Sequence, residues 1–241
     1  MTAMRQAPGN GSPHPLWFSP PDSAGSPRRA LTRERVVTEA LAFISADGAE
    51  SLSMRGLAAR LGVVPGALYR HVRSKEQLQD LILDGVLAEI DCQADQSQTW
   101  NEQVTILAGR LRTVLEDHPG IAGLLKTRDL ISPHSLALAE AFLEPLHAAG
   151  LPAAQAAGAY RLIYDYTLGF ALGDRTTIGE QRLQDARTSR ELRAFLRSLP
   201  ADRFPVLAAI GEHVWSGDRD ERFTASMNTI ITGLQATWRP H

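Results

Sequence analysis

Apolar side chains recur at helical spacing along almost the whole chain beyond its first thirty residues. In the first such run, the predicted apolar face consists of Val36, Val37, Ala40, Leu41, Phe43 and Ile44. Thr32 precedes this run as a helix N-cap residue, and Gly48 follows it as a residue suited to the left-handed C-terminal position. The pattern therefore predicts a helix that begins after Thr32 and ends at Gly48.

Two short helices and one longer helix are predicted next by the same signals. Ser53 can cap a short helix that Gly62 ends, and Pro65 can open a second that runs to His71, because proline is tolerated in a first turn. Ser74 can cap the longer helix. One buried stripe is expected along it, formed by Leu78, Leu81, Ile82, Gly85 and Val86.

The rest of the chain also reads as helices separated by proline and glycine, with no run of alternating β-branched residues. The expected helices are 101–117, 120–126, 133–149, 152–173, 188–198, 203–215 and 219–237. The pattern predicts an all-α fold in which an N-terminal three-helix domain, residues 31–76, is joined by a linking helix to a larger helical C-terminal domain, residues 77–241. Residues 1–30 are rich in proline and are expected to form a disordered arm, or in part to reflect the choice of start codon.

The most informative segment is 53–75, where two short helices meet at a tight turn around Gly62. Small Ala58 lets the helices approach closely, and a miniature core is expected from Leu57, Leu61, Val63 and Leu68. This is the layout of a helix-turn-helix, whose second helix enters the major groove of DNA.

Several side chains around this turn can face DNA. Gly66 and Ala67 give the second helix a small tip that can approach base edges and thymine methyl groups. Cationic or hydrogen-bonding side chains that can reach phosphates or bases are Arg55, Tyr69, Arg70, His71 and Lys75. For Arg28 and Arg29, two interpretations stay open: a basic arm in an adjacent minor groove, or a charged flexible tail.

Charge is unevenly distributed in a way that fits this interpretation. Residues 1–75 hold ten Lys/Arg against five Asp/Glu, whereas the remainder holds fifteen against twenty-two. A basic front on an acidic remainder favours a polyanion as partner. The single cysteine, Cys92, and the lack of a long apolar run predict a cytoplasmic protein without disulfide, membrane span or secretory signal.

Residues 32–90 resemble the DNA-binding domain of the TetR family of transcriptional regulators. The resemblance rests on Leu57-Ala58-Ala59-Arg60-Leu61-Gly62-Val63 and on Leu68-Tyr69-Arg70-His71-Val72-Arg73-Ser74-Lys75, which match L-A-x-x-L-G-V and L-Y-x-H-V-x-x-K. The resemblance implies that Tyr69, His71 and Lys75 contact the DNA backbone. It also implies positions at or near the bases for Arg55, Pro65, Gly66, Ala67 and Arg70.

The C-terminal domain resembles that of the tetracycline-repressor subgroup, at residues 115–119, 146–151, 167–170 and 233–234. Apolar and small residues in 152–173 and 220–237 favour a four-helix dimer interface or, alternatively, ordinary intrachain core. The resemblance implies a buried small-molecule pocket. Candidate wall residues are Leu124, Leu125, Phe142, Leu146, Tyr160, Tyr164, Phe170 and Trp215, with Arg128, Asp165 and His213 as polar anchors, although each can equally be core or surface.

One departure from the subgroup bears on the ligand. The tetracycline repressor holds magnesium partly through a histidine and a glutamate, whereas this chain has Gly173 where that glutamate falls and no histidine in the turn after Leu125. The sequence therefore predicts no metal or cofactor, and a hydrophobic, aromatic effector other than magnesium–tetracycline.

The sequence thus predicts a homodimeric repressor that binds palindromic duplex DNA and is released by a small molecule. A ligand-independent dimeric DNA-binding or architectural protein stays open as the alternative. An enzyme is not expected, because the chain has no H-x-x-x-H, G-x-S-x-G or P-loop motif, and Cys92 follows an acidic residue.

Overall fold

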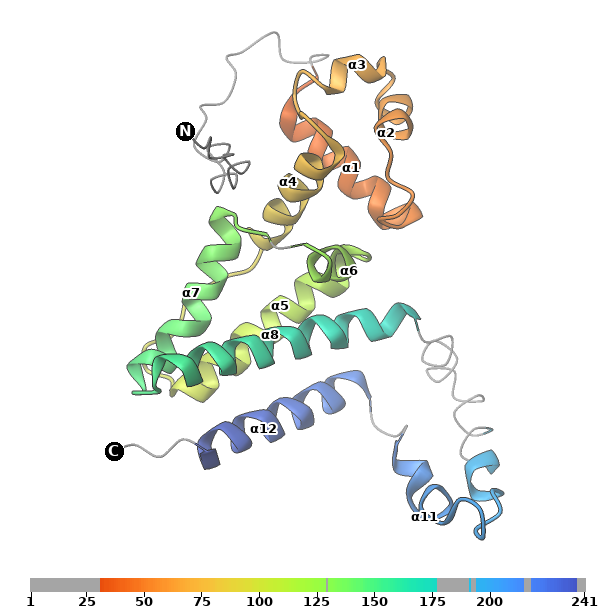
Figure 1. Ribbon diagram of the computed structural model, residues 1–241, viewed down its shortest axis with the longest axis vertical. Coiled ribbons are helices and arrows are strands. Elements are labelled where there is room, and N and C mark those ends of the chain that lie inside the picture. The colour runs from red at the N-terminus through yellow and green to blue at the C-terminus, as the bar shows by residue number, and fades with distance from the viewer. Residues whose placement is uncertain (1–30, 129, 177–190, 192–193, 215–217, 238–241) are drawn as a thin grey trace, which may run out of the picture.

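The computed structural model describes residues 31–128, 130–176, 191, 194–214 and 218–237. All regular secondary structure in these ranges is helical, which confirms the predicted all-α fold (Figure 1). The helices are α1 (Arg33–Asp47), α2 (Met54–Leu61), α3 (Pro65–Leu68), α4 (Lys75–Leu87), α5 (Trp100–Asp117), α6 (Ile121–Lys126), α7 (Pro133–Ala148), α8 (Ala153–Thr176), α11 (Pro205–Val214) and α12 (Arg219–Thr237). Of the expected helix 188–198, residues 191 and 194–197 are helical, and residues 188–190, 192 and 193 lie outside the described ranges.

The predicted caps of the N-terminal domain are confirmed. The hydroxyl oxygens of Thr32, Ser53 and Ser74 accept hydrogen bonds from backbone N–H groups three residues later, at 3.1–3.2 Å. Gly62 ends α2 with φ +69°, a conformation that residues with a Cβ rarely adopt. These contacts satisfy backbone groups that each helix end leaves without an intrahelical partner.

Two expectations for this domain are corrected. The second helix of the motif is shorter than expected, because α3 ends at Leu68 and the chain continues as a turn in which the N–H of His71 donates to Leu68 at 2.9 Å. Along α4, Gly85 is exposed and does not belong to the buried stripe, which Leu83 and Leu87 complete instead. The buried face of α4 is therefore wider than the single row of residues at i, i+3 and i+4 that the sequence predicts.

The N-terminal domain closes around a small core. Ile44 of α1, Leu57 of α2, Leu68 of α3 and both Leu78 and Ile82 of α4 are fully buried. Helix α4 then leaves this domain and runs to α5, α6 and α7, as Figure 1 shows. The predicted linking helix is thus present, and the same helix belongs to both cores.

The C-terminal domain packs α5, α7 and α8 against one another, with α6 covering one end of α8. Leu111, Phe142 and Ile163 are fully buried where these helices meet. Helix α12 runs alongside α8 (Figure 1) and buries Phe223, Met227 and Ile231.

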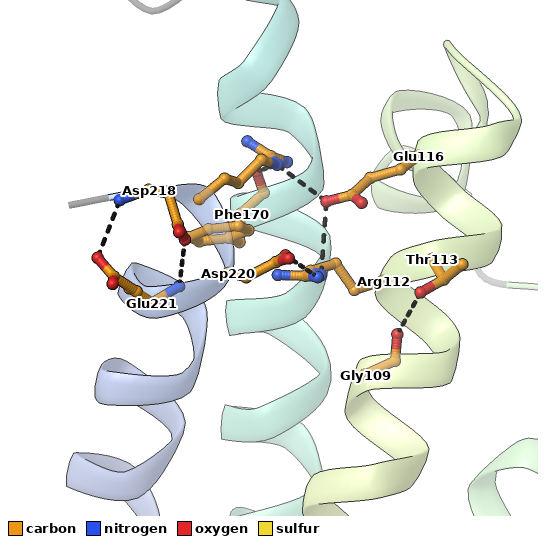
Figure 2. A network of polar contacts seen from close by, with 9 residues as sticks. Gly109, Arg112, Thr113, Glu116, Phe170, Asp218, Asp220 and Glu221 are labelled. Carbon is orange, nitrogen blue, oxygen red and sulfur yellow. Dashed lines mark hydrogen bonds and ion pairs between the residues drawn. The ribbon is translucent and has the colours of Figure 1, made fainter. Parts of the chain in front are cut away.

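A cluster of charges fastens the first turn of α12 to α5 and α8 (Figure 2). Glu116 of α5 pairs with Arg219 of α12 at 2.9 Å and with Arg112 of its own helix at 3.5 Å. Arg112 also pairs with Asp220, and Arg219 donates to the carbonyl of Phe170 at 3.1 Å. Glu116 is therefore the one acidic group in this cluster that touches both arginines.

Replacing Glu116 with glutamine is expected to lower the free energy of unfolding by about 1–2 kcal/mol, because two largely buried guanidinium groups lose a charged partner. Urea denaturation, monitored by circular dichroism, measures the free energy of unfolding. The matched control is Asp47→Asn, which removes an exposed partner of Arg60 and is expected to change stability by less than about 0.5 kcal/mol. Equal effects of the two substitutions would contradict a special role for the cluster.

Candidate DNA-binding surface and effector pocket

The turn between α2 and α3 displays most of the side chains predicted to face DNA. Arg55, Pro65, Gly66 and Arg70 are exposed. Tyr69 keeps 52% of its surface exposed although it is aromatic, which is unusual for a side chain with only a packing role. Each of these five residues is therefore accessible to a partner, and together with His71 and Lys75 they make up the candidate DNA-binding surface.

His71 and Lys75 lie at the edge of this surface and are half-buried. The carbonyl of His71 accepts a hydrogen bond from Arg33 Nε at 3.3 Å, which ties the turn after α3 to α1. Arg28 and Arg29, predicted to extend the surface, lie outside the described residues. Their expected contact with the minor groove stays a prediction.

At the tip of α3, the exposed small apolar residue is Val64 and not the predicted Ala67. Ala67, predicted to approach the bases, is only 7% exposed and packs into the small core, whereas Val64 is 71% exposed. Val64 precedes Pro65 and has extended backbone angles, φ −75° and ψ 145°, as a residue before proline usually does. The Val-Pro pair was the signal that could have identified Val64 as an exposed apolar side chain suited to a thymine methyl group.

Three polar contacts attach α4 to the C-terminal domain. Arg128 pairs with Asp80 at 2.6 Å. Asp84, only 8% exposed, accepts hydrogen bonds from both the backbone N–H and Nδ1 of His134, at 3.0 and 2.9 Å. Further along the chain, Glu89 lies 2.8 Å from His118 at the end of α5. Helix α4 and the residues just after it are therefore bound to α7, to the end of α5 and to the segment between α6 and α7.

The apolar residues predicted to line a ligand pocket form the core of the C-terminal domain. Leu124, Leu125, Phe142 and Leu146 are buried, and Phe142, Tyr160 and Tyr164 form a chain of ring contacts with centroids 5.8 Å apart. Burial raises the pKa of the Tyr164 hydroxyl, which is therefore a neutral hydrogen-bonding group at physiological pH. Phe170 is half-buried against Phe223, and Trp215 lies outside the described residues.

The three residues predicted as polar anchors do not converge on this core. Arg128 is engaged by Asp80, Gln79 and the carbonyl of Glu76. Asp165 is exposed and pairs with Arg161 of the same helix at 3.3 Å. His213 is exposed on α11, which Figure 1 shows on the far side of α8 and α12 from α7. Arg128 and Asp165 thus already have charged partners, and their role as ligand anchors stays a prediction.

A pocket of about 240 Å³ lies elsewhere in this domain, between the segment 91–98 that follows α4, helix α5 and one position of α7. Its smaller and apolar lining residues are Cys92, Ala94, Ile106, Leu107 and Ala141. Its polar lining residues are Gln93, Asp95, Gln98, Gln103 and Arg110. None of the residues predicted to bind a ligand lines it.

Arg110 holds one wall of this pocket in place. Its NH1 group donates to the carbonyls of Asp91 and Gln93 at 2.7 and 2.8 Å, and its NH2 group pairs with the Asp91 carboxylate at 3.2 Å. The adjacent Cys92 is half-buried, and burial together with the negative charge of Asp91 raises the pKa of its thiol. Cys92 is therefore a protonated thiol at neutral pH, although the nearby Arg110 acts in the opposite direction on its pKa.

A helix-turn-helix carried by a small three-helix domain, with a long helix leading into a larger helical domain, defines a DNA-binding regulator. The family model described as "Bacterial regulatory proteins, tetR family" matches residues 36–80. The model described as "Tetracyclin repressor-like, C-terminal domain" matches residues 93–238. The chain belongs to the TetR family and is a transcriptional regulator, not an enzyme.

Similar proteins include regulators of Saccharopolyspora and Streptomyces and tetracycline repressor proteins of Escherichia coli. An HTH-type transcriptional regulator of Saccharopolyspora erythraea is 31% identical over 227 residues, which is 94% of each chain. The HTH-type transcriptional repressor DrrR1 of Streptomyces coeruleorubidus is 29% identical over 225 residues, 91% of this chain and 83% of its own. Among solved structures, the TetR family protein ActR of Streptomyces coelicolor in complex with (S)-DNPA gives a TM-score of 0.76 at 31% identity, over 86% of this chain and 98% of ActR. ActR has also been solved with actinorhodin.

No helix in the described part of the chain is both long enough and apolar enough to cross a membrane.

Proposed function

We propose that this regulator is a homodimeric repressor that binds a palindromic operator and is released from it by a small aromatic molecule. The observation that carries the proposal is the surface around α3, where Val64, Tyr69 and Arg70 are exposed together at the free end of the domain. Exposed apolar, aromatic and cationic side chains on the second helix of a helix-turn-helix suit the floor and walls of a major groove.

Contacts with bases are proposed for Arg55, Pro65, Gly66 and Arg70, with Val64 added to the predicted set. Contacts with phosphates are proposed for Tyr69, whose side chain is exposed, and for His71 and Lys75 at the edge of the same surface. Ala67 contributes its backbone and not its buried side chain.

Dimerisation is proposed through the outward faces of α8 and α12. Leu162 of α8 is 49% exposed, and Ile230 and Leu234 of α12 are only partly covered within one subunit. Exposed glycines on the same two helices, Gly158 and Gly233 among them, permit close approach of a second pair of helices. Two copies related by a twofold axis would present their DNA-binding surfaces to two half-sites one helical turn apart.

The contacts of α4 support the proposal of release by a ligand. A ligand shifts the protein between two states only by its difference in affinity for them, typically about 1–3 kcal/mol of coupling. The pairs Arg128–Asp80 and His134–Asp84 give α5–α7 a route to the orientation of α4. The complexes of ActR with (S)-DNPA and actinorhodin support an effector of this general kind.

The proposal is tested with duplex DNA from the promoter region beside the gene. Fluorescence anisotropy measures the affinity of the protein for this DNA, and sedimentation measures its oligomeric state. A dimer is expected on a palindromic site. With about four phosphate charges neutralised, doubling the salt from about 0.1 to 0.2 M is expected to weaken binding about tenfold. A monomer that ignores every duplex at low salt would contradict the proposal. A dimer that binds but responds to no small molecule would support the ligand-independent alternative.

A further inference from the structure

The segment 61–68, Leu-Gly-Val-Val-Pro-Gly-Ala-Leu, contains no side chain that can donate or accept a hydrogen bond. It forms the turn between α2 and α3 and the whole of α3. Within it, Val64 is the large apolar side chain that stays exposed, at 71%. We propose that Val64 recognises the 5-methyl group of a pyrimidine in the major groove of each operator half-site. The inference rests on the proposed function and adds the chemical group that this part of the surface reads.

The surroundings of Val64 favour duplex DNA as its partner. Residues 51–75 contain five Lys/Arg and no Asp/Glu, and the side chains of Arg55 and Arg70 are exposed on either side of the segment 61–68 in the chain. A continuous stretch without acidic residues complements the phosphates that border a groove. The apolar side chain of Val64 therefore belongs to a surface whose charge attracts a polyanion.

The chemistry of base edges decides what an apolar side chain can read. In the major groove, guanine, adenine and cytosine present hydrogen-bonding groups, whereas thymine presents a methyl group at C5 beside its O4 acceptor. A cytosine methylated at C5 carries the same group. Removing a group of this size from water changes affinity about fourfold. Val64 can therefore distinguish a 5-methylpyrimidine from the other bases without forming a hydrogen bond.

The backbone holds Val64 in one position. The N–H of Val63 donates to the carbonyl of Ala58 at 3.0 Å, and the carbonyl of Val64 accepts a hydrogen bond from the N–H of Ala67 at 2.9 Å. Pro65 restricts the backbone of Val64 further, and a β-branched side chain has few rotamers. Little conformational freedom is therefore lost when this side chain contacts a base.

Gly66 leaves room for the close approach that such a contact requires. Its φ is not in the left-handed region, and a Cβ atom added to it would meet no atom of the described chain within 4 Å. Glycine in a helix is destabilising relative to alanine. Because neither backbone conformation nor packing in the described part of the domain requires glycine here, we attribute it to a partner that approaches the exposed side of α3.

The test begins with a duplex that the unmodified protein selects from a pool with a randomised centre. Each thymine of this duplex is then replaced by 2′-deoxyuridine, which lacks only the 5-methyl group. At one position in each half-site the replacement is expected to weaken binding about fourfold, and in both half-sites together about 15-fold. Fluorescence anisotropy measures the affinities.

A second pair of duplexes distinguishes the two sources of the methyl group. At the sensitive position, the thymine–adenine pair is replaced by cytosine–guanine or by 5-methylcytosine–guanine. The methylated pair is expected to bind about fourfold more tightly than the unmethylated one. Equal binding of these two duplexes would assign the contact to thymine alone.

Two substitutions assign the methyl contact to Val64. Val64→Ala is expected to weaken binding to the selected duplex about 15-fold and to bind the deoxyuridine duplex equally well, because the partner of the methyl group has been removed. The matched control is Val206→Ala, which truncates a valine of similar exposure, 65%, on α11. It is expected to keep the full difference between the two duplexes.

Three results would overturn the inference, and they are distinguishable. Specific binding that no deoxyuridine replacement weakens would leave the proposed function intact and remove the methyl contact. A deoxyuridine effect of unchanged size in Val64→Ala would assign the methyl group to another residue. A protein that enriches no duplex from the pool would overturn the proposed function, and the inference with it.

Discussion

Replacing Arg70 with alanine is expected to weaken binding to the specific operator about 10- to 100-fold, which corresponds to about 1–3 kcal/mol for an arginine that reads a base. Arg70 is exposed in the turn after α3 and makes no side-chain contact within the described part of the chain that would otherwise restrain it. The fold should therefore survive the substitution. Fluorescence anisotropy at fixed salt, on the operator and on a scrambled duplex, measures the affinity and its specificity.

Lys126→Ala is the matched control, because it removes one positive charge from an exposed position on α6, away from the DNA-binding surface. Its operator affinity is expected to stay within about twofold of the unmodified protein, since only long-range electrostatics change. If Arg70→Ala behaves like this control, Arg70 does not read a base. If it weakens both duplexes equally, Arg70 contacts phosphate instead.

Replacing Phe142 with alanine is expected to cost about 3–5 kcal/mol of unfolding free energy, the usual range for a buried phenylalanine. The side chain is fully buried on α7 and packs against Tyr160 of α8 with ring centroids 5.8 Å apart. The sequence predicted Phe142 as a pocket wall, but a residue without exposed surface acts first through packing. Chemical denaturation measures the loss.

Because a loss of this size approaches the whole stability of many domains, Phe142→Leu is included as a milder substitution and is expected to cost about 1–2 kcal/mol. Leu136→Ala on the same helix is the control, since Leu136 is 57% exposed and its removal is expected to change stability by less than about 0.5 kcal/mol. A Phe142→Ala protein that is as stable as this control would contradict the assignment of Phe142 to the core.

The N-terminal domain could be predicted closely because its determinants are local. Thr32, Ser53 and Ser74 cap helices whose first N–H groups lie three residues away, and Gly62 supplies a left-handed turn that few other residues tolerate. The exchange of Ala67 for Val64 at the tip of α3 shows the limit of this reasoning. Periodicity ranks faces of a helix well, but a four-residue helix has too few turns to define one.

The pocket between segment 91–98, α5 and α7 could not be predicted, because its walls come from three separate segments. Cys92 follows α4, Ile106 lies on α5 and Ala141 lies on α7, and nothing in their local sequence distinguishes them from surface residues. The aromatic side chains Phe142, Tyr160 and Tyr164 were predicted to line a pocket on their chemistry alone, yet packing places them in contact with one another.

The sequence by itself determined the helices, their order, the helix-turn-helix and the family, since each depends on capping, periodicity and short motifs that act over a few residues. Only the tertiary structure decided which charged groups are already paired, as Arg128 is with Asp80 and Arg110 with Asp91, and where an unfilled space remains. The physical reason is that pairing and cavities depend on how side chains from distant segments fill a shared volume, whereas capping and periodicity depend only on neighbours along the chain.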